Sequence, residues 1–141
     1  YFFEKTGMIA VGEDTGIVVA ALPGELGVKT RRWGAGKAAS DEEWIEYFMK
    51  KMEGKSMREA NFICSVCLFD GESEVFFEGE TKGRIQEHLQ LPLLPGLPLG
   101  SCFVPEGFDR VYSALTVDEK NEISHRGRAV MQLKQYLEET Y

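Results

Sequence analysis

The sequence lacks any long apolar run and contains only three cysteines and two histidines. A helix that spans a membrane needs about 20 consecutive apolar residues, so no membrane segment is predicted. Acidic residues outnumber basic ones, 23 to 16, and the net charge is -7. Because sequence-independent binding to DNA or RNA requires a broad basic face, nucleic acid is not an expected partner. A small anionic ligand held by a few cations remains compatible with this composition.

Two of the cysteines, Cys64 and Cys67, have the Cys-x-x-Cys spacing of a redox pair or of half a zinc site. They lie in the apolar run 62–69, which is typical of a buried strand, and strand positions three apart point to opposite faces. No second pair of this kind completes a zinc site. We therefore expect reduced, metal-free core thiols in a reducing compartment, the cytoplasm.

The chain is long enough for one domain over 1–141. Its first seven residues resemble the end of a helix closed by Gly7, which predicts that the N-terminus is incomplete. Two short strands are expected at 8–11 and 17–21, on either side of an acidic turn. A hairpin through Asp70-Gly71 is expected to join strands at 61–69 and 74–80. The segments 22–39 and 89–99 are rich in glycine or proline and predict irregular structure.

Two capping boxes, Ser40 with Glu43 and Thr116 with Glu119, mark predicted helix starts. A further helix is expected over 126–141. Two sets of residues have the spacing of one buried helix face: Trp44, Ile45, Phe48 and Met52, and Val130, Leu133, Leu137 and Tyr141. Helices separated from a hairpin indicate a mixed α/β (α+β) fold.

A block of polar residues near the C-terminus places Lys120, Ser124, His125 and Arg126 beside a predicted helix start. Unpaired N–H groups and the positive end of the helix dipole favour anions there, so the block predicts contact with a phosphate or nucleotide. The alternative is a solvated, charged helix entry. Taken alone, His125 fits a structural hydrogen bond as well as contact with a base.

The segment 13–16 predicts a β-turn that exposes Asp14, whose carboxylate could bind Mg²⁺ or orient a water. A plain turn is the alternative, because aspartate and glycine are common in turns. Arg32, in the irregular segment 22–39, is a candidate phosphate contact, with a solvated loop cation as the alternative.

Five segments, in this order, resemble those of the Ham1/RdgB family of inosine triphosphate pyrophosphatases: 13–17, 27–33, 77–85, 103–107 and 120–127. The resemblance implies a bent mixed β-sheet flanked by helices in two lobes, with the nucleotide bound between them. It also implies a homodimer. The implied reaction is Mg²⁺-dependent hydrolysis of damaged or non-standard purine nucleoside triphosphates, such as those of inosine and xanthosine, to monophosphate and pyrophosphate.

Particular residues inherit roles from this resemblance. Asp14 matches the catalytic acid and metal ligand. The implied substrate contacts are Thr15, which would donate its hydroxyl to phosphate or water, the phosphate contact Arg32, and the base-recognition residues Lys120, Ser124, His125 and Arg126.

The chain departs from the family pattern in two places. The N-terminal Thr-x-Asn-x-x-Lys phosphate loop and its strand have no counterpart, and Leu97–Ser101 replaces a Phe-Gly-Tyr/Trp-Asp-Pro segment. Because stacking contributes about 1–3 kcal/mol per base, weaker or redirected base binding is expected. Two other hypotheses stay open: a catalytically degenerate nucleotide-binding protein, and a dimeric interaction protein on the same scaffold.

Overall fold

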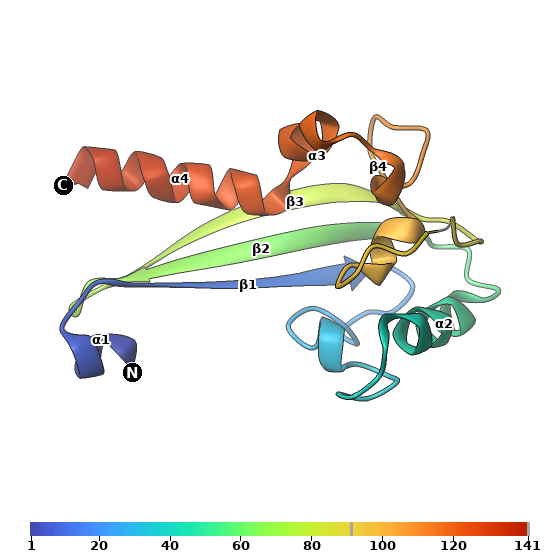
Figure 1. Ribbon diagram of the computed structural model, residues 1–141, viewed down its shortest axis with the longest axis horizontal. Helices are drawn as coiled ribbons and strands as arrows, with labels where there is room; N and C mark the ends of the chain where they lie inside the picture. Colours follow the sequence, from blue (N-terminus) through green and yellow to red (C-terminus); the bar gives the residue numbers. More distant parts are fainter. Residues whose placement is uncertain (91, 141) are drawn as a thin grey trace.

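The computed structural model describes residues 1–90 and 92–140, and its centre is a four-stranded antiparallel sheet in the order β1-β2-β3-β4. The strands are β1 Ala10–Val19, β2 Glu59–Phe69, β3 Glu74–Ile85 and β4 Phe103–Pro105. The first three run the length of the molecule (Figure 1). With the helices around this sheet, the predicted mixed α/β class is confirmed.

The prediction of two short strands around an acidic turn was wrong, because β1 is continuous from Ala10 to Val19. Glu13 lies opposite Val66, and Asp14 lies opposite Ser65. Every residue of β1 has a partner in β2, so the ladder satisfies backbone groups that a turn would leave to solvent. This gain outweighs the turn preference of aspartate and glycine.

The hairpin between β2 and β3 is confirmed. One carboxylate oxygen of Asp70 accepts from the N–H groups of Glu72 and Ser73, both at 2.9 Å, and this closes the turn. β3 continues to Ile85, five residues beyond the predicted end at 80. The extension lets β3 pair with β4 at 83–85.

The helices are α1 Phe2–Thr6, α2 Asp41–Met52, α3 Val117–Ile123 and α4 His125–Thr140. Short 3-10 turns occupy Thr30–Arg32, Pro98–Ser101 and Tyr112–Ala114. Gly7 closes α1 in the left-handed conformation as predicted, and both capping boxes are present. The segments 22–39 and 89–99 otherwise lack helices and strands, although Leu91 lies outside the described residues.

Two apolar cores cover the same face of the sheet, because alternate residues of β2 are buried from Ala60 to Leu68. Near the hairpin, α4 packs on this face through Ala129 and Leu133. At the other end the cover comes from α2, whose predicted stripe of Trp44, Ile45, Phe48 and Met52 is buried. Figure 1 shows α4 along β3 and α2 beyond the far end of the strands.

The predicted buried face of the C-terminal helix needs one correction. Val130 is 45% exposed, whereas Tyr136 packs with Leu133 and Leu137 against the sheet. The helix starts at His125, and the side that contains Leu133, Tyr136 and Leu137 faces β2 and β3. Tyr141, also predicted on this face, lies outside the described residues.

Cys64 and Cys67 lie on opposite faces of β2, as predicted, and both thiols are free. Cys64 is buried, and burial raises the pKa of its thiol, whereas Cys67 is only half-buried on the other face, so the prediction of a core thiol is correct for Cys64 alone. Within 1–90 and 92–140, no helix is both long and apolar enough to cross a bilayer.

Candidate functional site

A cavity of about 440 Å³ lies where the two cores meet. Four chain segments line it, namely 15–16 of β1, the loop residues 30–31, the segment 95–99 and the start of α4 with its preceding residue, 124–126. Three aromatic side chains, Trp44, Phe62 and Tyr112, complete the walls. This volume is within the range of pockets that bind small molecules.

A larger cavity of about 600 Å³ lies at the end of α2 beside Arg58. The guanidinium of Arg58 donates to the carbonyl oxygens of Met52, Lys55, Ile85 and Gln86. These bonds close the C-terminal end of α2 and tie it to β3. Arg58 is therefore a structural cation, and the smaller cavity is the better candidate for a ligand.

The start of α4 sits directly on the sheet because Gly79 of β3 has no side chain. A Cβ atom there would lie 2.0 Å from the carbonyl oxygen of His125 and 2.8 Å from the amide nitrogen of Ala129. Ser124 caps the helix, since its Oγ accepts the N–H of Gly127 at 3.0 Å. A glycine on the strand and a serine cap thus place Ser124, His125 and Arg126 at the cavity.

His125 is held as a neutral ring. It stacks on Phe62, with ring centroids 5.4 Å apart and planes inclined by 18°, and its Nδ1 is 3.4 Å from Oγ1 of Thr81. Burial and then the charge of Arg126 lower the pKa of His125 to about 4. Because the Thr81 hydroxyl donates to the carbonyl of Ile123, its oxygen is left to accept from Nδ1–H. This arrangement assigns the unprotonated nitrogen to Nε2.

Glu13 links β1 to α4. Its Oε1 accepts from the Thr15 hydroxyl at 2.6 Å, from Cys64 Sγ at 3.2 Å and from Arg126 Nε at 3.2 Å. These donors, the Thr15 hydroxyl first, lower the pKa of the Glu13 carboxyl. The ion pair uses Nε of Arg126, and the terminal amino groups of that side chain have no partner among the described residues. Glu13 therefore orients Arg126 at the cavity.

The sequence assigned no role to Glu13, although one signal was present. Residues two apart in a strand share a face, so Glu13 and Thr15 had to point the same way once β1 was recognised as continuous. Because a turn was predicted at 13–16, the shared direction of Glu13 and Thr15 was not recognised.

The structure brings four of the seven predicted site residues together, since Thr15, Ser124, His125 and Arg126 all line the cavity. Lys120 lies behind this wall, with its ammonium 5.6 Å from the ring centre of Tyr112. Arg32 is outside the lining, and its Nη2 donates to the carbonyl of Val28 at 3.1 Å.

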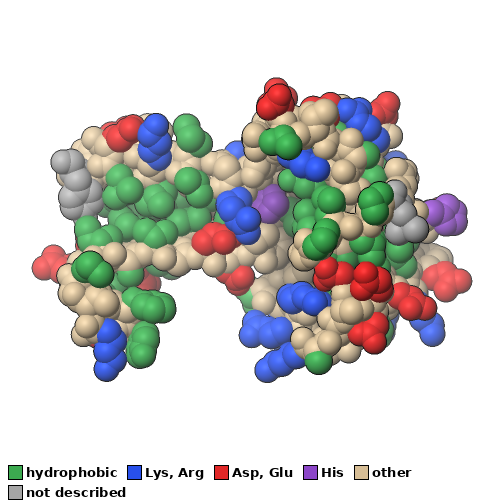
Figure 2. All heavy atoms as spheres, viewed as in Figure 1, with side chains coloured by type: hydrophobic (Ala, Val, Ile, Leu, Met, Phe, Trp, Pro, Cys, Tyr) green, Lys and Arg blue, Asp and Glu red, His purple; other side chains and the backbone are tan. Residues whose placement is uncertain are grey.

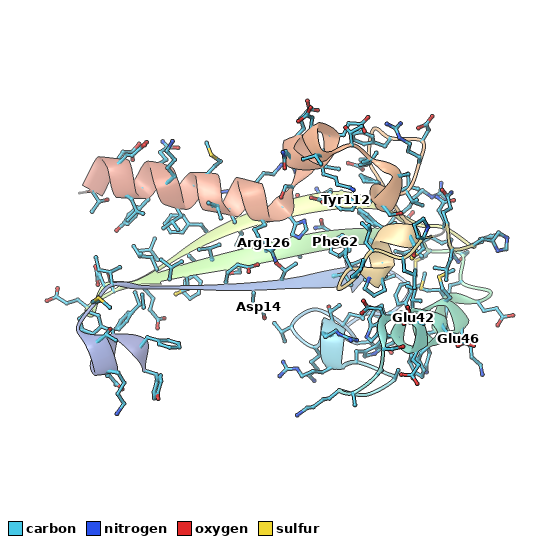
Figure 3. The ribbon with its side chains drawn as sticks, in the orientation of Figure 1. Asp14, Glu42, Glu46, Phe62, Tyr112 and Arg126 are labelled. Carbon is cyan, nitrogen blue, oxygen red and sulfur yellow. The ribbon has the colours of Figure 1, made fainter. Side chains whose placement is uncertain are left out.

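Asp14 points away from α4, on the opposite side of β1 from Arg126 (Figure 3). Its Oδ1 accepts the N–H of Thr15 at 3.0 Å, and the side chain is exposed. Among residues 1–90 and 92–140, no group of three or more His, Cys, Asp and Glu side chains could hold a metal. A single exposed carboxylate fits Mg²⁺ when substrate phosphates and water supply the other ligands.

Figure 2 shows basic, acidic and histidine side chains side by side at the waist between the two halves of the molecule, where apolar side chains also reach the surface. The cavity at this junction combines two arginines, four hydroxyl groups and several aromatic rings, and no Asp or Glu of the described residues lines it. Donors in such a setting favour an anionic ligand with a flat ring.

These features define a mixed α/β protein with a cationic, ring-lined cavity of ligand size at the junction of two cores. The chain belongs to the Ham1 family, whose sequence model matches residues 1–136.

Relatives and solved structures agree with this assignment. The chain is 37% identical over 131 residues to a dITP/XTP pyrophosphatase of Caldanaerobacter subterraneus, covering 92% of this chain and 64% of that protein. It is 36% identical to a dITP/XTP pyrophosphatase of Deinococcus deserti, covering 91% and 60%. The chain therefore spans a little under two thirds of the length of these curated relatives.

The fold matches the Staphylococcus aureus Ham1 protein with a TM-score of 0.87 at 27% identity, covering 98% of this chain and 71% of that one. A Ham1 protein from Coxiella burnetii matches with a TM-score of 0.85 at 32% identity, covering 96% and 70%.

Proposed function

We propose that this chain binds non-standard purine nucleoside triphosphates, of the inosine and xanthosine type, and hydrolyses them to monophosphate and pyrophosphate. The observation that carries the proposal is the convergence of Ser124, His125 and Arg126 with Thr15 on one cavity without a carboxylate in its described lining. The names of the relatives, dITP/XTP pyrophosphatases, point to the same substrates.

In this reaction a water oxygen bonds to the α-phosphorus, the bond from that phosphorus to the oxygen bridging to the β-phosphate breaks, and pyrophosphate leaves. The water gives up a proton to the solvent as the new bond forms. Asp14 orients this water and would hold Mg²⁺, which would neutralise phosphate charge when bound. Arg126 donates to phosphate or base oxygens, and Thr15 does so once its hydroxyl leaves Glu13. Because Asp14 and Thr15 lie on opposite faces of the edge strand β1, the triphosphate would pass along this edge.

Other assignments from the family resemblance stay proposals. We propose that Lys120 acts on the ligand through the ring of Tyr112, which lines the cavity. Arg32 reaches a phosphate only if its side chain leaves the carbonyl of Val28. A homodimer and a cytoplasmic location are also retained as predictions.

The proposal is tested by pyrophosphate release from inosine triphosphate with Mg²⁺, comparing the unchanged chain with Asp14→Asn. The substitution removes the charge that orients water and metal, and we expect release to fall by a factor of about 100 or more. The melting temperature should stay the same, because the Asp14 side chain is exposed.

Two outcomes would count against this account. Equal release by folded Asp14→Asn would remove Asp14 from catalysis. Nucleotide binding without release by the unchanged chain would favour a catalytically degenerate nucleotide-binding protein. That alternative has support in the replaced segment Leu97–Ser101.

A further inference from the structure

Arg31 is the second arginine of the cavity, and the family resemblance gave it no role. Its Nη2 donates to the carbonyl oxygen of Ala39 at 2.8 Å and lies 3.6 Å from Oδ1 of Asp41. Both contacts use the same terminal nitrogen. Nε and Nη1 therefore have no partner among the described residues, and the side chain is half exposed. Arg31 is anchored at one corner of its guanidinium and has donors left for a ligand.

Asp41 holds a second wall of the same cavity. Its Oδ2 accepts the N–H of Gly96 at 2.6 Å, and Gly96 lies in the lining segment 95–99. The Asp41 side chain is only 20% exposed, which strengthens its contacts relative to those of an open surface pair. One carboxylate thus fixes Arg31 and the segment 95–99 relative to each other.

The chemistry of the lining selects for acceptors. The charged groups are Arg31 and Arg126. Of the serine and threonine hydroxyls in the lining, Thr15 donates to Glu13 and Thr30 to the carbonyl of Gly27. The Ser124 hydroxyl has no acceptor among the described residues and is left to donate to a ligand. No carboxylate of the described residues is present to accept from an amino group of the ligand. A buried donor of the ligand that faces the guanidinium of Arg31 would lose its bond to water without gaining another, because this group has only donors.

We infer that Arg31, oriented by Asp41, contacts an acceptor oxygen on the edge of the purine and makes the cavity selective for a 2-oxo purine. Xanthine carries a carbonyl oxygen at C2 and gives up a ring proton more readily than hypoxanthine, which has only hydrogen at C2. Guanine presents an amino donor at C2 instead. The expected order of affinity is xanthine, then hypoxanthine, then guanine. This inference rests on the function proposed above.

Calorimetric titration with the 5′-monophosphates of xanthosine, inosine and guanosine tests the inference without requiring turnover. The key variant is Arg31→Gln, and Lys37→Gln is the control, because Lys37 is an exposed cation of the same loop outside the cavity. We expect Arg31→Gln to lower the affinity for xanthosine monophosphate about ten-fold and the affinity for inosine monophosphate much less. Lys37→Gln should leave both affinities unchanged.

The outcomes are separable. If Arg31→Gln lowers the affinity for all three ligands equally, the arginine contacts the phosphate. That result would overturn this inference and leave the proposed function standing. Equal affinity of the unchanged chain for the xanthosine and inosine ligands would do the same. Pyrophosphate release from inosine triphosphate without binding of any monophosphate would overturn the inference alone, and the absence of both would overturn the proposed function as well.

Asp41→Asn separates positioning from direct contact. Asparagine keeps an oxygen that can accept from Gly96 but removes the charge beside Arg31. The preference for xanthosine over inosine monophosphate should shrink while binding of the inosine ligand persists. An unchanged preference would show that Asp41 does not orient Arg31.

Discussion

At the scale of single residues, His125 sets how the cavity responds to pH. Its pKa is lowered from 6.5 to about 4, first by burial and then by Arg126. The unfolded chain takes up this proton as the pH falls below 6.5, whereas the folded chain resists it until about pH 4. Stability is therefore full above pH 6.5 and decreases between 6.5 and 4, by an amount on the order of 1 kcal/mol per pH unit.

Chemical denaturation at several pH values checks this prediction, with His125→Gln as the comparison. The variant should lack the part of the slope between pH 6.5 and 4. Glu13, whose pKa is lowered from 4.5 first by the Thr15 hydroxyl, begins to lose its stabilising effect only as the pH falls below 4.5, so the slope between 6.5 and 4.5 reports His125. Identical pH profiles for both proteins would show that His125 is not held neutral.

Sequence reasoning predicted the cavity wall at 124–126 because capping and charge act locally. Ser124 caps α4, and the cation Arg126 follows two residues later. It did not identify Arg31, since the direction of an arginine in a loop depends on distant partners. Those partners, Ala39 and Asp41, lie eight and ten positions further along the chain.

At the scale of elements, the contact between α4 and β3 depends on Gly79. A methyl group at this position would overlap the backbone of the first turn of α4. We expect Gly79→Ala to lower the free energy of unfolding by about 1–3 kcal/mol, because neither backbone can yield easily. Nucleotide affinity should fall as well, since 124–126 would shift.

Gly12→Ala is the matched control for this prediction. Gly12 is also a strand glycine, in β1, and a Cβ atom there would meet nothing within 4 Å. The free energy of unfolding of Gly12→Ala should stay within about 0.5 kcal/mol of that of the unchanged chain. Denaturation curves of Gly79→Ala and Gly12→Ala give the two free energies of unfolding. Equal values would contradict the close contact between Gly79 and α4.

Strand β1 could not be predicted from the local sequence, whereas the hairpin could. Alternating burial along β2 and the Asp70 turn were visible in the sequence, because they reflect local patterns. The middle of β1 is polar and contains Gly12 and Gly16, so nothing local distinguishes it from a turn. Its strand state comes from pairing with β2, which lies about 50 residues away.

At the scale of the whole molecule, the site exists because one sheet face carries two cores. Phe62 joins them, since its ring meets Phe103 at 4.9 Å on one side and His125 at 5.4 Å on the other. The sequence predicted the mixed α/β class, the hairpin of β2 and β3, and the helices α2, α3 and α4, but neither β4 nor the continuity of β1. The resemblance to a known family, rather than periodicity, predicted that a ligand would lie between two lobes.

The central claim is that this junction binds a purine nucleotide through Arg126. Calorimetric titration with inosine triphosphate tests it most directly, with divalent metal chelated so that no hydrolysis occurs. Arg126→Ala should weaken binding about ten-fold or more, because it removes charge-assisted bonds in a partly dry site. The melting temperature should change little, since Arg126 is 60% exposed and its pair with Glu13 is worth little to stability.

Lys134→Ala is the control, because this lysine lies on the same helix and pairs only with Glu138 in the described chain. It should bind inosine triphosphate as tightly as the unchanged protein. Weakening by Arg126→Ala alone is the result that the account predicts. Inosine triphosphate binding that Arg126→Ala leaves intact, or no binding by the unchanged chain, would contradict it.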